Sequence, residues 1–220
     1  MFVVLEGLDG AGKSTQATLL RDCWGRQDIQ TKWLHFPRFD TPVFGELIAK
    51  FLRGDFGDLH TVDPFLVALL FAGDRHDAAA TVRTWLDNGY NVLLDRYVYS
   101  NIAYQCAKLS DATRRQALRQ FILDMEYRYF AIPKPDLTVF LDVPLAHVAD
   151  KLGEERSGSD RAYLQGKKDI HENSMELQRN VRRIYLEQAA LDPTFKVVDC
   201  ADGDRILDPA RIFDKLKALM

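Results

Sequence analysis

The sequence lacks any long hydrophobic run. Its first apolar segment, residues 2–5, ends at the charged residue Glu6. A membrane-spanning helix needs about 20 mostly apolar residues, and a secretory signal needs a longer apolar segment than this one. The sequence therefore predicts a cytoplasmic protein that does not enter a membrane.

Cysteine is scarce and its spacing forms no metal-binding pattern. The three cysteines, Cys23, Cys106 and Cys200, are far apart and form no C-x-x-C pair. An odd number of widely spaced cysteines indicates neither a disulfide framework nor a zinc site. The histidines show no H-E-x-x-H or related ligand spacing either. We expect no transition-metal site, and we expect the thiols to lie in the core.

The sequence also lacks an excess of basic residues. It has 29 Lys and Arg against 32 Asp and Glu, for a net charge of -3. This balance argues against a surface for nucleic acid or anionic lipid. Hydrophobic residues make up 47% and charged residues 28%, ordinary values that exclude disordered and coiled-coil classes. The length of 220 residues favours a single domain over residues 1–220.

Short apolar segments alternate with longer helical patterns along the chain. Uninterrupted apolar strands such as 92–94 and 139–141 are typical of a parallel sheet covered on both faces. Strand–helix alternation therefore favours an α/β fold of three layers with about five parallel strands. The predicted strands are 2–6, 32–36, 91–95, 137–142 and 195–199.

The segments between these strands are long enough for helices. Ser110 is a candidate N-cap and Gly89 a candidate residue after a helix C-terminus. Residues 153–168 mix glycine, serine and charge with little apolar surface, so we expect a mobile lid there. The predicted helices are 13–25, 43–52, 63–88 (with a possible bend near Gly73), 99–108, 111–129, 145–152, 169–191 and 209–219.

The segment after the first predicted strand fits the pattern G-x-x-x-x-G-K-[ST] and leads directly into a predicted helix. Glycines let the backbone curl so that its N–H groups converge on phosphate oxygens, and the helix adds its positive N-terminal end. Lys13 is expected to reach the β and γ phosphates of ATP. The motif predicts a P-loop NTPase fold. The predicted ATP-binding residues are Gly7, Leu8, Asp9, Gly10, Ala11, Gly12, Lys13, Ser14 and Thr15.

A carboxylate ends the third predicted strand. A P-loop fold places its magnesium-side acid at such a position, so we expect Asp95 and the Ser14 hydroxyl to bind Mg²⁺. The next residue, Arg96, would project from the carboxyl end of the strand into the crevice where ligands collect in open parallel sheets.

A P-loop alone is compatible with GTPases, motors, transporter ATPases and small-molecule kinases. The guanine-reading N-K-x-D motif is missing, and the chain is too short for a motor. Arginines in predicted loops and at element ends favour a kinase with a phosphorylated acceptor, because two anionic phosphates must be brought together. An acceptor phosphate is itself a nucleophile, so no separate catalytic base is needed. These arginines are Arg38, Arg75, Arg96, Arg156 and Arg161.

Most of the chain resembles the thymidylate kinases, which phosphorylate dTMP to dTDP with ATP and Mg²⁺ in the synthesis of dTTP. The most specific match is Asp95-Arg96-Tyr97 followed by Ser100-Asn101 and Ala103-Tyr104. The other matching motifs are the P-loop with Asp9, Phe36-Pro37-Arg38, Phe71-Ala72-Gly73-Asp74-Arg75, and Asp169 to Glu172.

The resemblance implies a role for each matching residue. Phe71 would stack on the thymine ring and Arg75 would bind its O4 edge. Arg38 and Arg96 would hold the acceptor phosphate, and Arg96 would also act in catalysis with Lys13. Asp9 would touch the sugar 3′-hydroxyl or the Mg²⁺ shell. The implied substrate-binding residues are Asp9, Phe36, Arg38, Phe71, Arg75, Arg96, Ser100, Asn101, Tyr104 and His171.

The chain departs from the family pattern at two places. Gly10 stands where some members carry a catalytic arginine, so the chain resembles members whose lid supplies it, through Arg156 or Arg161. Lys167 and Lys168 are the alternatives. His171 stands where many relatives have a tyrosine that disfavours ribonucleotides, which leaves sugar selection open.

The resemblance also implies a homodimer, built through the apolar residues 65–71, although these residues could equally fill the monomer core. The expected partners are the small molecules dTMP and ATP, with no nucleic acid and no membrane. Two other functions remain open: a different nucleoside monophosphate or deoxynucleoside kinase, and a P-loop protein that binds ATP for regulation.

Overall fold

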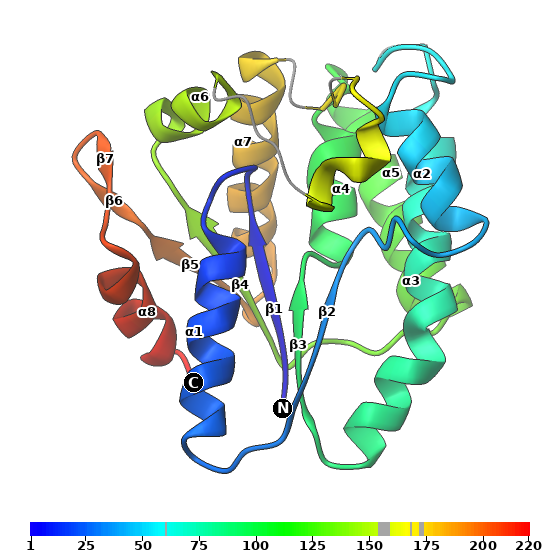
Figure 1. Ribbon diagram of the computed structural model, residues 1–220. Helices are drawn as coiled ribbons and strands as arrows, with labels where there is room; N and C mark the ends of the chain where they lie inside the picture. The colour runs from blue at the N-terminus through cyan, green and yellow to red at the C-terminus, as the bar shows by residue number, and fades with distance from the viewer. Residues whose placement is uncertain (60, 154–158, 168, 172–173) are drawn as a thin grey trace.

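A five-stranded parallel sheet, in the order β2-β3-β1-β4-β5, forms the centre of the molecule (Figure 1). The computed structural model describes residues 1–220 except 60, 154–158, 168 and 172–173. The strands are β1 (Phe2–Gly7), β2 (Thr31–His35), β3 (Asn91–Asp95), β4 (Leu137–Asp142) and β5 (Phe195–Asp199). The three-layer α/β prediction with five parallel strands is confirmed, and each strand lies within one residue of its predicted bounds.

The central strand β1 is buried along its whole length. Its residues pair in parallel with β3 on one side, as in Val4↔Leu94, and with β4 on the other, as in Leu5↔Val139. Because all five strands run the same way, their carboxyl ends meet at one edge of the sheet, at the top of Figure 1. Ligands of open parallel sheets bind at this edge.

Helices cover both faces of the sheet. On one face α1 packs against α8, and on the other α4 contacts α3, α5 and α7 (Figure 1). The helices are α1 (Lys13–Gly25), α2 (Phe44–Leu52), α3 (Pro64–Asp87), α4 (Val98–Cys106), α5 (Ala112–Leu123), α6 (Leu145–Gly153), α7 (Met175–Leu191) and α8 (Pro209–Lys217). Within the described residues, no helix is long and apolar enough to span a membrane.

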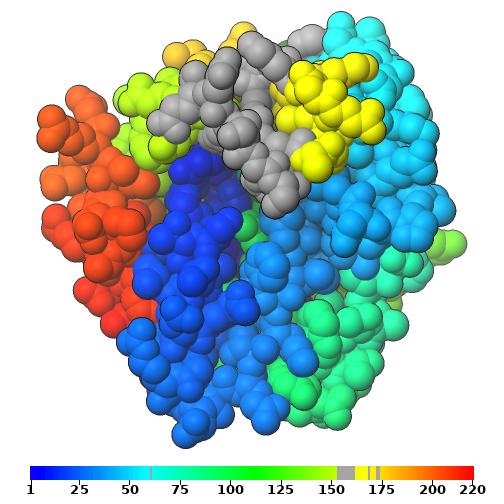
Figure 2. Space-filling model, in the orientation of Figure 1, coloured from blue at the N-terminus to red at the C-terminus, as the bar shows by residue number. Residues whose placement is uncertain are grey.

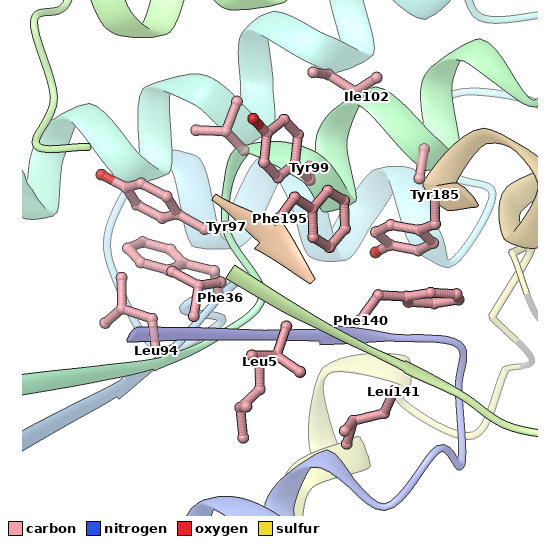
Figure 3. Packing of buried hydrophobic residues seen from close by; sticks show 14 of the residues in the cluster. Leu5, Phe36, Leu94, Tyr97, Tyr99, Ile102, Phe140, Leu141, Tyr185 and Phe195 are labelled. Carbon is pink, nitrogen blue, oxygen red and sulfur yellow. The ribbon is translucent and has the colours of Figure 1, made fainter. Parts of the chain in front are cut away.

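Aromatic side chains join the helices to the sheet. Figure 3 shows Phe140 of β4 facing Tyr185 of α7, and their ring centroids lie 4.6 Å apart. Tyr99 of α4 stacks on Phe195 of β5 at 4.7 Å. Burying aromatic rings of this size contributes strongly to core stability. These contacts fix α4 and α7 on the sheet.

Several predicted helix boundaries are wrong, each for a local reason. The predicted cap Ser110 is displaced by its neighbour Asp111, whose side chain accepts from the Arg114 amide and caps α5. The helix predicted over 169–191 begins only at Met175, because the Ser174 side chain caps it there.

Other differences concern shorter segments. The helix predicted over 111–129 ends as α-helix at Leu123 and continues as a π-helical turn, η1 (Asp124–Tyr129). A small hairpin, β6 (Ala201–Asp202) and β7 (Arg205–Ile206), was not predicted. Cys106 and Cys200 are buried as expected, whereas Cys23 is only half-buried.

The predicted lid, 153–168, includes residues 154–158 and 168, which lie outside the described residues. Its described part contains a 3-10 helix, η2 (Ser159–Leu164), which contacts α2. In Figure 2 the yellow residues of η2 lie beside the light-blue and cyan residues of α2 and the loop that follows it.

Candidate active site

A cavity of about 370 Å³ lies at the carboxyl edge of the sheet. Every predicted substrate-binding residue except Arg38 lines it. The lining residues are Asp9, Ser14, Trp33, His35, Phe36, Pro37, Phe39, Leu52, Phe71, Arg75, Arg96, Ser100, Asn101, Tyr104, Gln105, Tyr163, Asp169 and His171. Residues far apart in the sequence therefore meet in one place, with the P-loop at one end.

The P-loop connects β1 to α1. Gly12 sits at the N-cap of α1 with a φ of 79°, a backbone conformation that glycine adopts at little cost. The buried Lys13 amine donates to the carbonyl oxygens of Gly7, at 3.3 Å, and Leu8, at 3.1 Å. Burial lowers the pKa of Lys13 to about 8. The loop thus holds a titratable cation beside the backbone N–H groups of a helix start, the arrangement that binds phosphate.

Asp95 is the buried acid at the end of β3. Its Oδ2 lies 3.5 Å from His35 Nδ1, whereas Oδ1 has no hydrogen-bond partner in the described part of the chain. Burial opposes ionisation, but Lys13 and His35 hold the pKa of Asp95 below its usual value. A buried, ionised carboxylate with one unpaired oxygen fits a cation at this position.

The donor set here matches magnesium better than a transition metal. No group of three or more His, Cys, Asp or Glu side chains that could hold a metal occurs among the described residues. Mg²⁺ needs only one or two protein oxygens, because water and substrate phosphates complete its octahedron. The Ser14 hydroxyl and Asp95 can provide those oxygens.

Arg96, Asp9 and Tyr104 form a polar cluster between the P-loop and α4. Arg96 Nη2 donates to Asp9 Oδ1 at 2.7 Å, and the Tyr104 hydroxyl donates to Asp9 Oδ2 at 2.9 Å. Although burial opposes ionisation, Arg96 and Lys13 lower the pKa of Asp9 to about 2. Asp9 therefore stays ionised at neutral pH and holds the Arg96 guanidinium over the cavity.

Glu6 supports this cluster through hydrogen bonds to the start of α4 and to α7, a role that the sequence analysis missed. Its Oε1 accepts from the backbone amides of Tyr97, at 2.9 Å, and Ser100, at 3.1 Å, and its Oε2 accepts from the Tyr185 hydroxyl at 2.9 Å. Arg96, directly before Tyr97, has a φ of 67°, an uncommon conformation for a residue of its size. An acidic residue in an otherwise apolar predicted strand was the sequence signal that could have revealed it.

The opposite end of the cavity is lined by α3 and α4. Phe71 and Arg75 lie one turn apart on α3, and Asn101 faces them from α4. Arg75 is buried and forms a bidentate ion pair with Glu126 of η1, a residue that the sequence analysis also missed. Gly73, between Phe71 and Arg75, packs so closely on the Phe44 ring that any added Cβ would overlap it.

Arg38 lies outside the cavity lining. Its Nε donates to Asp74 Oδ1 at 2.8 Å, and its Nη2 donates to Asp77 Oδ2 at 2.7 Å. Its neighbours Pro37 and Phe39 do line the cavity. The structure therefore brings the predicted Phe36-Pro37-Arg38 motif to the site but directs the guanidinium towards α3.

His171 lies in the cavity with its ring 5.1 Å from that of Tyr104. Burial lowers the pKa of His171 well below its usual value, so the ring is neutral. Its Nε2 has no hydrogen-bond partner in the described part of the chain. A neutral imidazole with one unpaired nitrogen can donate to or accept from a sugar hydroxyl.

The predicted lid residues lie partly outside the described residues. Arg156 and Lys168 lie outside the described residues, and for Arg161 only the backbone, in η2, is described. The Lys167 amine lies 2.6 Å from Asp55 on the surface. Tyr163 of η2, which was not predicted, stacks on Phe39 with ring centroids 3.7 Å apart and lines the cavity.

Comparison with known proteins gives one consistent result. The family model described as thymidylate kinase matches residues 5–206. The thymidylate kinase of Mycobacterium tuberculosis strain H37Rv is 35% identical over 191 residues, which cover 86% of this chain and 86% of that protein. The probable thymidylate kinase of Thermococcus kodakarensis is 33% identical over 92% of this chain and 90% of its own length.

A solved structure agrees with these sequence matches. Thymidylate kinase from Candida albicans superposes with a TM-score of 0.73 and 28% identity, covering 99% of this chain and 89% of its own. The sequence match covers nearly the whole chain, and it includes the P-loop and the residues that line the cavity. The chain belongs to the thymidylate kinase family.

Proposed function

We propose that the protein transfers the γ-phosphoryl group of ATP to the 5′-phosphate of dTMP, which yields dTDP for dTTP synthesis. The observation that carries this proposal is the continuity of one cavity from the P-loop, at Ser14 and Asp9, to the aromatic and polar end at Phe71, Arg75 and Asn101. A nucleotide whose base lies at the Phe71 end of this cavity would place its phosphate beside Arg96.

The residues at the P-loop support the phosphoryl-transfer part of the proposal. The loop amides and Lys13 would hold the β and γ phosphates. Mg²⁺, held by Ser14 and Asp95, would neutralise phosphate charge when bound. Arg96, fixed by Asp9, would hold the acceptor phosphate, whose own oxygen is the nucleophile. A lid arginine, Arg156 or Arg161, would stabilise charge on the transferring group.

The other end of the cavity supports thymine as the base. Phe71 offers an aromatic face for stacking, which is worth about 1–3 kcal/mol per base. Asn101 Oδ1 is a buried acceptor without a partner among the described residues, and Arg75 offers a donor. Thymine presents an N3–H donor beside the O4 acceptor, so the two edges match.

A coupled ADP-release assay would test the proposal. The acceptors are dTMP, dUMP, UMP, dCMP, dGMP and AMP, each with ATP and Mg²⁺, and Arg96→Ala is the comparison variant. We expect dTMP to be the best acceptor and the variant to lose most of its turnover. A rate of ADP release that is the same with every acceptor and without one would favour a P-loop ATPase or regulatory protein instead.

A different preferred acceptor is the second outcome that the assay can reveal. The Candida albicans structure is described as revealing the origin of that enzyme's broad substrate specificity. Turnover of dGMP or dCMP at the rate of dTMP would retain a nucleoside monophosphate kinase and would refute thymine selection by Phe71 and Arg75.

A cytoplasmic homodimer completes the proposal. Leu66 and Leu69 of α3 are exposed, and Leu69 lines a shallow apolar hollow with Phe121 and Tyr129. An exposed patch of this kind on a helix pair is typical of a subunit interface. We expect light scattering to give twice the 25.2 kDa chain mass. Leu69→Glu should reduce this mass, while Leu191→Glu, at another exposed leucine, should not.

A further inference from the structure

Glu126 is a fully buried acid that none of the predicted motifs includes. It lies in the π-helical turn η1, directly after α5. Turns of this type are rare and often occur at functional sites. A buried carboxylate is costly unless it is paired, so its partners indicate its purpose.

Both carboxylate oxygens of Glu126 are bound by residues at the far end of the cavity. Arg75 Nε donates to Oε2, and Arg75 Nη2 donates to Oε1 at 2.7 Å. Asn101 Nδ2 also donates to Oε1, at 3.0 Å. Arg75 and Asn101 are each only 2% exposed, so these three side chains form a closed network between α3, α4 and η1.

This network fixes which atom of the Asn101 amide faces the cavity. Nδ2 donates one hydrogen to Glu126 and the other to the Ala68 carbonyl oxygen, at 3.0 Å. Both of these partners can only accept, so the amide cannot be turned round without losing both hydrogen bonds. Oδ1 is left as a buried acceptor without a partner among the described residues.

The same carboxylate sets the orientation of Arg75. Its Nε and Nη2 are directed at Glu126, and Nη1 makes no hydrogen bond within the described part of the chain. Arg75 and Asn101 line the cavity together. Arg75 therefore presents a donor there and Asn101 an acceptor, and the buried Glu126 fixes both assignments.

We infer that Glu126 is a positioning residue that makes the acceptor site selective for a pyrimidine with an N3–H donor beside a C4 carbonyl. Cytosine offers the opposite pattern, with an acceptor at N3 and an amino group at C4, and would leave Oδ1 of Asn101 facing a lone pair. This inference rests on the proposed function, because it takes a pyrimidine nucleotide as the acceptor. Glu126 itself does not touch the substrate.

Glu126→Gln tests the inference with almost no change in volume. The carboxamide has one acceptor oxygen, whereas three donor groups of Arg75 and Asn101 face this position. Whichever way the new amide turns, its NH₂ group faces at least one of these donors, so Arg75 and Asn101 no longer keep a single orientation. We expect KM for dTMP to rise about tenfold while KM for ATP changes less than about twofold. The ratio of kcat/KM for dTMP to that for dCMP should fall about tenfold.

Two further variants make the result decisive. Glu187→Gln makes the same substitution at an exposed acid that pairs with Arg183, and it should leave every parameter unchanged. Glu126→Asp keeps the charge but withdraws the carboxylate, so it should fold and show a smaller loss of the same ratio. It carries the test if thermal unfolding shows that Glu126→Gln does not fold.

The outcomes separate this inference from the proposed function. A wild-type protein that does not phosphorylate dTMP would refute the proposed function before any variant is measured. An active wild type whose dTMP to dCMP ratio is unchanged in folded Glu126→Gln or Glu126→Asp would overturn the inference alone. It would also be overturned if neither variant folds, because Glu126 would then be a structural residue.

Discussion

The two ends of the cavity are built in different ways. The phosphate end is built mainly on consecutive residues, 7–15, with their backbone groups and one lysine, and is completed by Asp95 and Arg96 at the carboxyl end of β3. The base end joins side chains from α3, α4 and η1 through a buried ion pair between residues 51 positions apart. The first depends on local chain geometry and the second on the packing of separate helices. Changes at one end should therefore leave binding at the other end nearly intact.

The largest effect is expected from Lys13→Ala, which removes the only side-chain cation supplied by the P-loop motif itself. We expect kcat to fall about 100- to 1,000-fold, as for the loss of a group that stabilises transition-state charge. The dTMP affinity, measured by calorimetry, should change little. Lys196→Ala, at an exposed lysine of β5, is the control. A parallel loss of dTMP binding would show that the two ends are coupled.

At the base end, Phe71→Ala should raise KM for dTMP about 5- to 100-fold, because it removes a stacking surface. Steady-state kinetics should show KM for ATP close to the wild-type value. The exposed Phe56 provides the matched control, Phe56→Ala. Unchanged KM for dTMP would mean that the Phe71 ring serves only the packing of the helix.

The pH dependence should differ between the two substrates. The pKa of Lys13 is lowered to about 8 by burial, so the amine of the free enzyme is charged below that pH and neutral above it. We expect kcat/KM for ATP to fall as pH rises through about 8, approaching tenfold per unit. The value for dTMP should change less, since Asp9, with a pKa of about 2, stays ionised throughout. Identical profiles would contradict a role of Lys13 confined to ATP.

The smallest effect on catalysis is expected from Gly73→Ala. The added methyl group would overlap the Phe44 ring and force α2 and α3 apart. Overpacking of this kind costs about 1–3 kcal/mol of stability. Denaturant unfolding should show this loss, with a modest rise in KM for dTMP. Gly25→Ala, where a Cβ meets nothing within 4 Å, is the control. Equal stability of the two variants would refute the close packing of α2 on α3.

The same contrast explains what could be predicted from the sequence. The strands were found because they are continuous apolar segments, and the P-loop was found because its residues are consecutive. Phe71, Arg75, Asn101 and Tyr104 were found through family motifs, and all four line the cavity.

Residues that act through distant partners were missed. Glu126 pairs with Arg75 across 51 positions, and Glu6 binds the amide of Ser100 across 94. No local pattern encodes such pairings, because they arise only when separate helices pack on the sheet. The contacts of Arg38 with Asp74 and Asp77 were missed for the same reason.

The most direct test is to measure where the γ-phosphorus of ATP goes in the reaction. The protein would be incubated with dTMP, Mg²⁺ and ATP labelled at the γ-phosphorus, and the products would be separated. We expect the label to appear in dTDP, in amounts equal to the ADP formed, and we expect Arg96→Ala nearly to abolish this transfer. Label released as inorganic phosphate, with dTMP left unchanged, would contradict this expectation.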